Sequence, residues 1–196
     1  MPVVGLSVGT RPDLVSSDVV DFLSSFCAPN YEVWLELGVQ TVDKLQLAWL
    51  RRGHTLDAVV DVLERTEHSP LSLCVHLISG FPGEADGQLL TSARWALDRG
   101  VTGLKFHPLH VLRGSPLEDM YERGSYVPLD LETYVRRVAL VLWKEGHRFV
   151  TQRLTADARP PRLVAPLWVA RKDDVLRRID ELVDMHDSKE KEERVV

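Results

Sequence analysis

The sequence predicts an α/β fold in which parallel strands, joined by helices, form a partial (β/α) barrel of the TIM type. Short apolar runs alternate with amphipathic stretches, and the runs are continuous enough for strands covered on both faces. No Gly-x-Gly-x-x-Gly follows the first run, which argues against a dinucleotide-binding sheet. A barrel or partial barrel is therefore the better prediction than an open doubly wound sheet.

The elements follow in order along the chain. The predicted strands are Val3–Val8, Glu32–Leu37, Leu71–Ile78, Gly103–Phe106 and Arg148–Leu154. Amphipathic periodicity predicts helices over Val19–Phe26, Val42–Arg51, Leu56–Glu67, Asp86–Arg99, Leu131–Trp143 and Arg171–His186. Their expected N-caps include Ser17 or Asp18, Thr41, Thr55 and Asp130, and Gly53 is the expected left-handed stop of the second helix.

Composition sets the broad class. With 44% hydrophobic and 27% charged residues, and a formal net charge of -5, the chain has the make-up of a globular domain. The charge gives no electrostatic reason to expect nucleic-acid binding. Cys27 and Cys74 make no disulfide framework, and no stretch is long and apolar enough for a membrane span. We therefore expect a cytoplasmic protein without a membrane partner.

Ionisable residues interrupt three consecutive strands on one face. Glu36, His76 and Lys105 alternate with aliphatic residues, so they point away from the helices and toward a barrel lumen. Burying them unpaired would cost several kcal/mol each, so they pair with one another or with a ligand. The pattern favours a ligand-facing site; a structural Glu36–Lys105 ion pair beneath His76 stays open as the alternative.

Loops after the strands carry further polar and glycine residues. These loops are Gly9–Asp13, Ser79–Glu84 and Arg113–Ser115, and the two glycines of Ser79–Glu84 allow a ligand to approach the backbone closely. Ordinary turn chemistry is an equally good explanation of each loop taken singly.

Taken together, these segments resemble the radical S-adenosylmethionine superfamily, specifically its YhcC-like family. The resembling strings are Val4–Asp13, Tyr31–Thr41, Arg52–His54, His76–Glu84, Gly103–His110, Arg153–Thr155 and Ala165–Trp168. Thr10–Asp13, Glu36–Gln40 and Arg52–Thr55 also resemble the radical domain of the elongator catalytic subunit, which makes tRNA a conceivable substrate.

The resemblance implies a barrel that holds S-adenosylmethionine against a [4Fe-4S] cluster. An electron from the cluster cleaves the sulfonium, and the resulting radical abstracts hydrogen from a substrate that the sequence does not identify. By position, Glu36, Gln40, Ile78 and Gly80 are the expected cofactor-binding residues. The expected substrate-facing or lumen-facing residues are Thr10, Arg11, Arg52, His54, His76, Lys105, His107 and His110. No residue is given a proton-transfer role.

The resemblance also implies a division of the chain. Residues 1–145 match the C-terminal part of the barrel, 146–186 an extension and 187–196 a charged tail. The family's first two strands and its Cys-x-x-x-Cys-x-x-Cys-type cluster loop have no counterpart here, and neither Cys27 nor Cys74 substitutes for them. We therefore expect no metal ligands and no radical chemistry from this chain alone. We expect it to be a fragment, a mis-started gene model or one half of a split enzyme, whose partner would then be a missing N-terminal half.

Two other function classes stay open. A metal-dependent barrel hydrolase would use His76, His107 and His110 with Glu36 around zinc. A non-catalytic barrel would keep the ligand pocket and bind without reacting.

Overall fold

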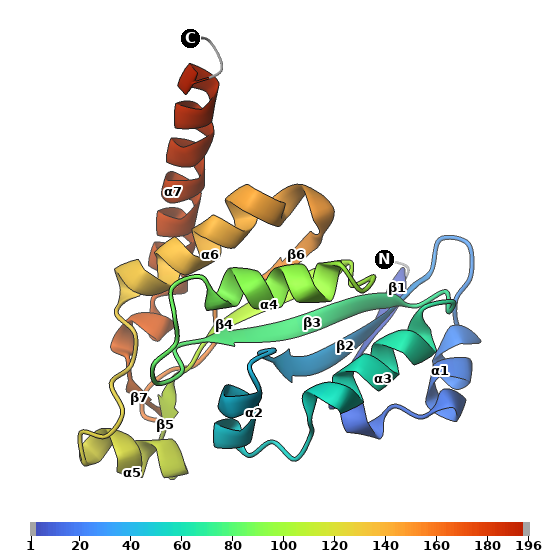
Figure 1. Cartoon of the computed structure of the whole chain (residues 1–196), viewed down its shortest axis with the longest axis horizontal. Coiled ribbons are helices and arrows are strands. Elements are labelled where there is room, and N and C mark those ends of the chain that lie inside the picture. Colours follow the sequence, from blue (N-terminus) through green and yellow to red (C-terminus); the bar gives the residue numbers. More distant parts are fainter. Residues whose placement is uncertain (1–2, 194–196) are drawn as a thin grey trace. The chain divides into compact units, whose positions relative to one another are not determined.

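A five-stranded sheet forms the frame of the molecule, in the order β1-β2-β3-β4-β6 (Figure 1). The computed structural model describes residues 3–193. The strands of this sheet are β1 (Gly5–Thr10), β2 (Glu32–Gln40), β3 (Ser72–Ser79), β4 (Gly103–Pro108) and β6 (Val150–Arg153). β2 pairs in parallel with both β1 and β3, as the predicted βαβ alternation requires. All five predicted strands are confirmed, with ends shifted by one to three residues.

Helices connect these strands and follow the predicted order. They are α1 (Ser17–Ser24), α2 (Lys44–Leu50), α3 (Leu56–Thr66), α4 (Gln88–Leu97), α5 (Pro116–Glu122), α6 (Leu131–Glu145) and α7 (Lys172–Glu193). Short 3-10 turns cover Pro12–Leu14, Gly146–Arg148 and Leu167–Ala170. Among the described residues, no helix combines the length and apolar composition that a membrane crossing needs.

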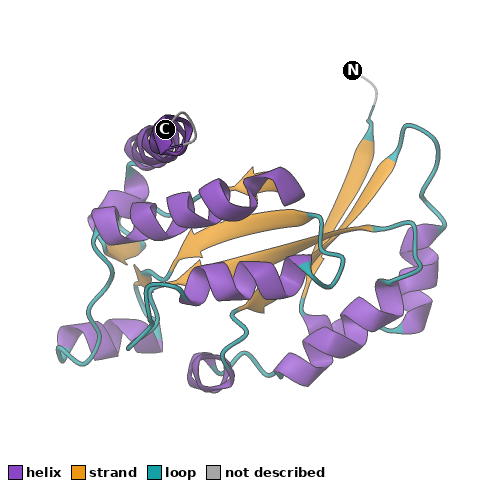
Figure 2. Cartoon of the chain, turned by 45° about the horizontal axis from the view of Figure 1, so that its top comes forward, coloured by secondary structure: helices purple, strands orange, loops and turns teal. Residues whose placement is uncertain are grey.

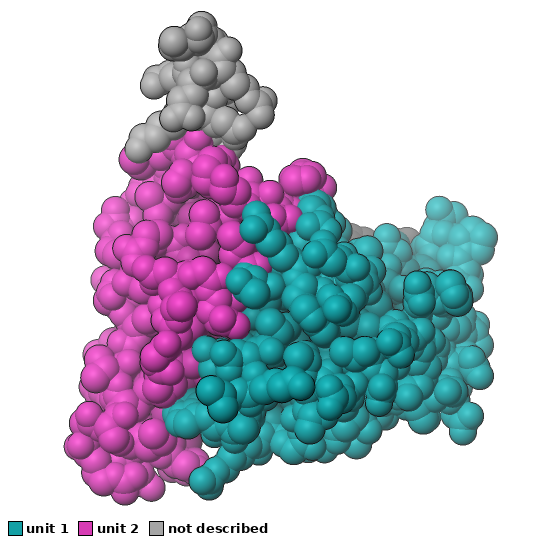
Figure 3. All heavy atoms as spheres, in the orientation of Figure 1, with its two compact units in different colours: residues 1–77, 91–105, 148–152 teal, residues 78–90, 106–147, 153–196 magenta. Residues whose placement is uncertain are grey.

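The chain divides into two compact units, coloured separately in Figure 3. Unit 1 comprises residues 1–77, 91–105 and 148–152, and unit 2 comprises residues 78–90, 106–147 and 153–196. The predicted division at residues 145 and 186 stays a prediction.

Unit 1 contains β1, β2, most of β3 and the first half of β4. Helices α1 and α3 lie side by side next to this sheet (Figure 2). Val33, Leu35 and Leu37 of β2 are at most 1% exposed, and Val59 and Val62 of α3 are fully buried. The aliphatic face that the sequence predicts is therefore the core of this unit.

Unit 2 is built on the packed pair α6 and α7 (Figure 1) and on a small antiparallel pair of strands, β5 (Val111–Leu112) and β7 (Leu163–Ala165). Tyr134 of α6 is fully buried. Its hydroxyl donates to the Leu154 carbonyl at 2.8 Å. The sequence did not predict β5, β7 or α5, because strands of two or three residues and a helix of about two turns give no readable periodicity.

Several predicted helix ends were wrong. Ser16, rather than Ser17 or Asp18, caps α1, since its side chain accepts the Val19 N–H. Asp43 caps α2 in place of Thr41, because β2 runs on to Gln40 and leaves Thr41 buried in the turn. The caps at Thr55 and Asp130 are confirmed.

Two stop signals also differ. Arg51, with a φ of 52°, takes the left-handed position at the end of α2 that Gly53 was expected to take. α7 continues to Glu193, well past the predicted end at His186. Residues 194–196 lie outside the described residues, and the predicted charged tail over 187–196 stays a prediction.

Candidate functional site

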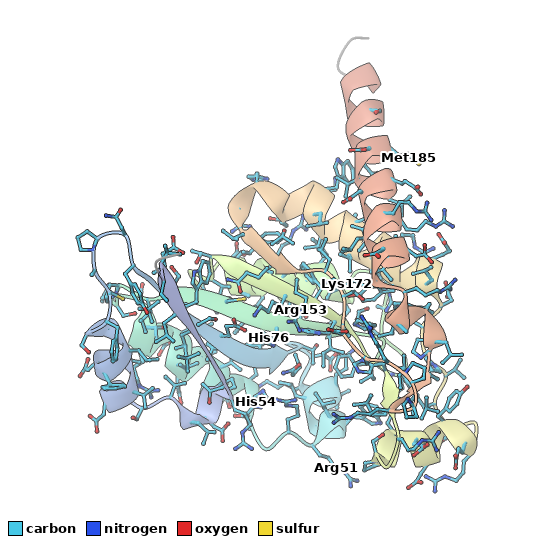
Figure 4. The ribbon with its side chains drawn as sticks, turned by 180° about the vertical axis from the view of Figure 1, so that it is seen from behind. Arg51, His54, His76, Arg153, Lys172 and Met185 are labelled. Carbon is cyan, nitrogen blue, oxygen red and sulfur yellow. The ribbon has the colours of Figure 1, made fainter. Side chains whose placement is uncertain are left out.

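Four polar side chains of unit 1 meet on one face of the sheet. The Glu36 carboxylate accepts from the His76 ring at 2.8 Å and from the Lys105 ammonium. Its other oxygen accepts from the Ser7 hydroxyl. We call Ser7, Glu36, His76 and Lys105 the Glu36 cluster; Figure 4 labels His76 within it.

Strand register brings the cluster together. Glu36 lies opposite Gly9 of β1 and Cys74 of β3 in the parallel ladders. Side chains two residues apart share a face, which places Ser7, His76 and Lys105 around it. The prediction that Glu36, His76 and Lys105 share one face is confirmed. Ser7 was missed, although its place on alternate positions of a Val-rich strand was a usable signal.

The cluster stays partly open to solvent. The side chains of Glu36, Lys105 and His76 are 12%, 13% and 27% exposed. Burial raises the pKa of Glu36, but hydrogen bonds from Lys105, Ser7 and His76 and the charge of Lys105 outweigh it and lower the pKa to about 2. At neutral pH Glu36 is therefore an ionised group that only accepts hydrogen bonds.

The end of β2 forms a second polar spot beside Gly38. A Cβ at Gly38 would lie 2.7 Å from the Gln40 amide nitrogen and 3.3 Å from an Arg52 guanidinium nitrogen. Gln40 has a φ of 71° and is 4% exposed, so the strand bends here and turns the amide inward. Glycine at position 38 therefore makes room for Gln40 and Arg52 to converge.

The first rim loop holds a separate ion pair. Arg11 and Asp13 form a salt bridge of 2.6 Å, with Arg11 at 42% side-chain exposure, after Thr10 ends β1. This pairing lowers the pKa of Asp13, chiefly through the hydrogen bond from Arg11. Thr10 and Arg11 are thus rim residues, outside the Glu36 cluster.

His54 is 7% exposed, and within the described residues neither ring nitrogen meets the geometry of a hydrogen bond. It lines a cavity of about 200 Å³ with residues of α2 and the start of α3. Burial lowers the pKa of His54, against the Val39 backbone, which raises it, and with Arg52, which lowers it. A buried neutral imidazole results.

Unit 2 carries the glycine loop that follows β3. The Glu84 carboxylate accepts the backbone N–H groups of Gly80 and of Phe81, the latter at 3.2 Å, and it pairs with Arg137 of α6 at 2.7 Å. The side chains of Glu84 and Arg137 are only 2% and 6% exposed. This closed arrangement fixes the loop.

Gly80 itself has a φ of 119°, which favours glycine, and its carbonyl accepts the Tyr126 hydroxyl at 3.1 Å. Ile78, His107 and His110 also belong to unit 2. The His110 ring lies 2.9 Å from the Pro108 carbonyl. The expected cofactor and substrate roles of four residues in unit 2 therefore stay predictions: Ile78, Gly80, His107 and His110.

The two thiols do not fit an iron–sulfur cluster. Cys74 is fully buried, and burial raises the pKa of its thiol to about 12, whereas a cluster binds thiolates. The Cys27 thiol donates to the Pro70 carbonyl at 3.7 Å. Among the residues whose side chains the structure describes, no group of three or more His, Cys, Asp or Glu residues is placed to hold a metal ion. The zinc hydrolase alternative therefore has no ligand set in the described part of the chain.

Sequence comparisons relate the chain to known proteins. Residues 101–184 match the Radical_SAM C-terminal domain. Protein YhcC of Escherichia coli is 35% identical over 184 residues, which cover 94% of this chain and 60% of YhcC. YtqA of Bacillus subtilis is 33% identical over 91% of this chain and 55% of its own length. A tRNA uridine(34) acetyltransferase of Methanocaldococcus jannaschii is 30% identical over 64% of this chain and 23% of its own length.

Solved structures share the fold. Elp3 of Methanocaldococcus infernus superposes with a TM-score of 0.75 at 22% identity, over 91% of this chain and 42% of Elp3. Coproporphyrinogen III oxidase (HemN) of Escherichia coli gives 0.53 at 15% identity, over 72% of this chain and 32% of HemN. The predicted partial barrel of α/β type is thereby confirmed. The chain spans about 60% of the length of YhcC and less of the other relatives.

Proposed function

Because this chain belongs to the radical S-adenosylmethionine superfamily and matches part of its YhcC-like members, we propose that it holds the nucleoside of S-adenosylmethionine. In this superfamily the cofactor supplies radical chemistry, and the protein binds it, orients it and excludes water. The observation that carries the proposal is the partly exposed, ionised Glu36 cluster of unit 1. At Gly38 on the strand of Glu36, the side chains of Gln40 and Arg52 converge.

The Glu36 cluster suits the ribose. Ribose hydroxyls are donors, and Glu36 with a pKa of about 2 is an acceptor at every physiological pH. Lys105 and Ser7 hold the carboxylate in one orientation, so little rotamer freedom remains to be lost on binding. We assign the ribose contact to Glu36 and keep Lys105 as its positioning partner.

Gln40 and Arg52, which converge at Gly38, suit the other polar groups of S-adenosylmethionine. The Gln40 amide offers both a donor and an acceptor, and the Arg52 guanidinium matches a carboxylate such as that of the methionine moiety. The adenine contact expected of Ile78 and Gly80, which belong to unit 2, stays a prediction from the family resemblance.

No step through an iron–sulfur cluster is assigned to this chain, because its cysteines do not fit one. Radical chemistry would need cluster ligands from outside these 196 residues. Two free cysteines without a disulfide favour the cytoplasm as the place where it works. RNA is the proposed substrate class, since the relatives include tRNA uridine(34) acetyltransferases.

Equilibrium dialysis of the whole chain against S-adenosylhomocysteine tests the proposal. We expect saturable binding of the wild type and a loss of at least about tenfold in Glu36→Gln, which removes a charge-assisted acceptor. Glu32→Gln is the matched control on the same strand, since Glu32 is exposed and accepts from Trp34 at 2.9 Å. Its affinity should change by less than about twofold. Absence of binding by the wild type, or equal affinities of the two variants, contradicts the proposal.

A further inference from the structure

Basic charge concentrates in one short stretch of unit 2. Residues 153–172 contain five Arg or Lys and one Asp, a formal net charge of +4 in a chain whose total is -5. Figure 4 labels Arg153 and Lys172, which lie at the two ends of this stretch. All five cationic residues are exposed. The total charge therefore conceals a locally basic stretch, although Arg171 at its end lies 3.7 Å from Asp174.

Backbone contacts gather three arginines within this surface. The Arg113 N–H donates to the Arg162 carbonyl at 2.9 Å, and the Arg113 guanidinium donates to the Pro161 carbonyl at 3.2 Å. The Leu163 N–H closes a turn onto the Arg159 carbonyl at 2.9 Å. We call Arg113, Arg159 and Arg162 the arginine cluster. It stands on the paired strands β5 and β7, which have buried residues at Val111, Leu163 and Ala165.

Two of the three arginines have a carboxylate within 4.0 Å, both at long ion-pair distances. Arg159 lies 4.0 Å from Asp157, with both side chains more than three-quarters exposed, where an ion pair is worth little. Arg113 lies 3.7 Å from Glu118, whose carboxylate also accepts the Gly114 N–H at 2.6 Å. In the described part of the chain, Arg162 has no carboxylate partner. Most of the positive charge thus faces solvent.

We propose that the arginine cluster binds the phosphate backbone of the RNA substrate. The inference rests on the proposed function for the choice of RNA, and on the exposed, poorly neutralised guanidinium groups for the surface. Guanidinium groups match phosphate oxygens in pairs, and neutralising phosphates releases counterions, which makes binding salt-dependent. A rigid frame under the cluster reduces the entropy lost on binding.

Binding of labelled unfractionated tRNA to the whole chain, measured by fluorescence anisotropy at several salt concentrations, tests this. We expect Arg159→Gln with Arg162→Gln to weaken binding about tenfold at low salt. We also expect the slope of log K against log [salt] to fall by about 0.7 to 0.9 for each phosphate that the double variant no longer neutralises. Both substituted side chains are exposed, and both backbone carbonyls remain, so folding should persist.

The matched control is Arg177→Gln with Arg178→Gln on α7. It removes the same two charges, but these arginines pair with Glu181 and Glu132, each at 2.5 Å. Binding by this control should change by less than about twofold. Arg159→Lys with Arg162→Lys keeps the charge but loses the paired guanidinium geometry, so its affinity should lie between those of the wild type and the Gln double variant.

Other outcomes overturn the inference. They are undetectable tRNA binding, equal salt slopes for wild type and the Gln double variant, and a Lys double variant as weak as the Gln one. Binding of polyglutamate in place of tRNA would also overturn it, in favour of an acidic protein partner. S-adenosylhomocysteine affinity of the Gln double variant should match the wild type, so failure of the arginine surface is separable from failure of the nucleoside site.

Discussion

Glu36 of unit 1 and Glu84 of unit 2 are both glutamates paired with a cation, yet their surroundings differ. In the described part of the chain, the hydrogen-bond partners of the Glu36 carboxylate are side chains. The side chains of Glu36 and His76 are 12% and 27% exposed. Glu84 is 2% exposed and accepts from two backbone N–H groups as well as Arg137. Burial raises the pKa of Glu84, against the Gly80 N–H and Arg137, whereas the partners of Glu36 lower its pKa to about 2.

We interpret the difference as that between a binding arrangement, which we propose for Glu36, and a structural one at Glu84. An open carboxylate with side-chain partners can exchange one of them for a ligand at small cost, because water already reaches the group. A closed carboxylate that satisfies backbone donors cannot do so without unmaking the loop. Both clusters are built from a strand or loop residue and a distant cation, so the presence of an ion pair does not by itself distinguish the two roles.

The largest expected effect is on the free energy of unfolding and concerns the buried Glu84. Arg137→Met leaves Glu84 buried without its cation and should lower the free energy of unfolding by about 3–5 kcal/mol. Arg136→Met is the neighbouring control, because Arg136 is 57% exposed and lies 3.7 Å from Asp86. It should cost less than about 1 kcal/mol. Urea unfolding of both variants gives the answer, and equal small losses would show that Glu84–Arg137 is not a structural pair.

A smaller effect concerns Glu36 and the pH dependence of stability. Because folding lowers the pKa of Glu36 from 4.5 to about 2, its contribution to stability is present above pH 4.5 and is lost as the pH falls toward 2. The free energy of unfolding of the wild type should therefore fall more steeply across this window than that of Glu36→Gln. Glu32→Gln serves as control and should keep the wild-type slope. If the free energy of unfolding of wild type and Glu36→Gln changes equally with pH, Glu36 is not strongly paired in the folded chain.

The smallest expected effect extends the comparison to His54, a buried group without a paired charge. Folding lowers its pKa through burial, so the unfolded chain binds the proton first. Stability should decline as the pH drops below about 6.5, the ordinary value for histidine. Melting temperatures at pH 7.5 and 5.5 should differ less in His54→Gln than in the wild type, while His68→Gln, at an exposed site, should behave as the wild type. A wild-type-like shift in His54→Gln would mean that His54 is not the group responsible.

The sequence predicted the parallel strands and the shared face of Glu36, His76 and Lys105, because alternation along a strand is a local property. It placed Thr41 and Gly53 wrongly because Gln40 and Arg51 take positive φ angles, which residues other than glycine adopt infrequently and which the sequence does not mark. It did not assign Arg137 a role, since the partner Glu84 lies 53 positions away and no spacing rule links a loop to a distant helix. The net charge of -5 gave no reason to expect nucleic-acid binding. A total charge does not show how charge is distributed, and residues 153–172 carry a formal net charge of +4.

Hydrogen exchange of the backbone amides, with and without saturating S-adenosylhomocysteine, tests the central claim most directly. If the end of β2 holds the nucleoside, ligand should slow exchange at Leu37–Gln40, while β5, β7 and α7 should exchange at unchanged rates. Unchanged exchange at Leu37–Gln40 in the presence of bound ligand would contradict the assignment of the Glu36 cluster as the nucleoside site.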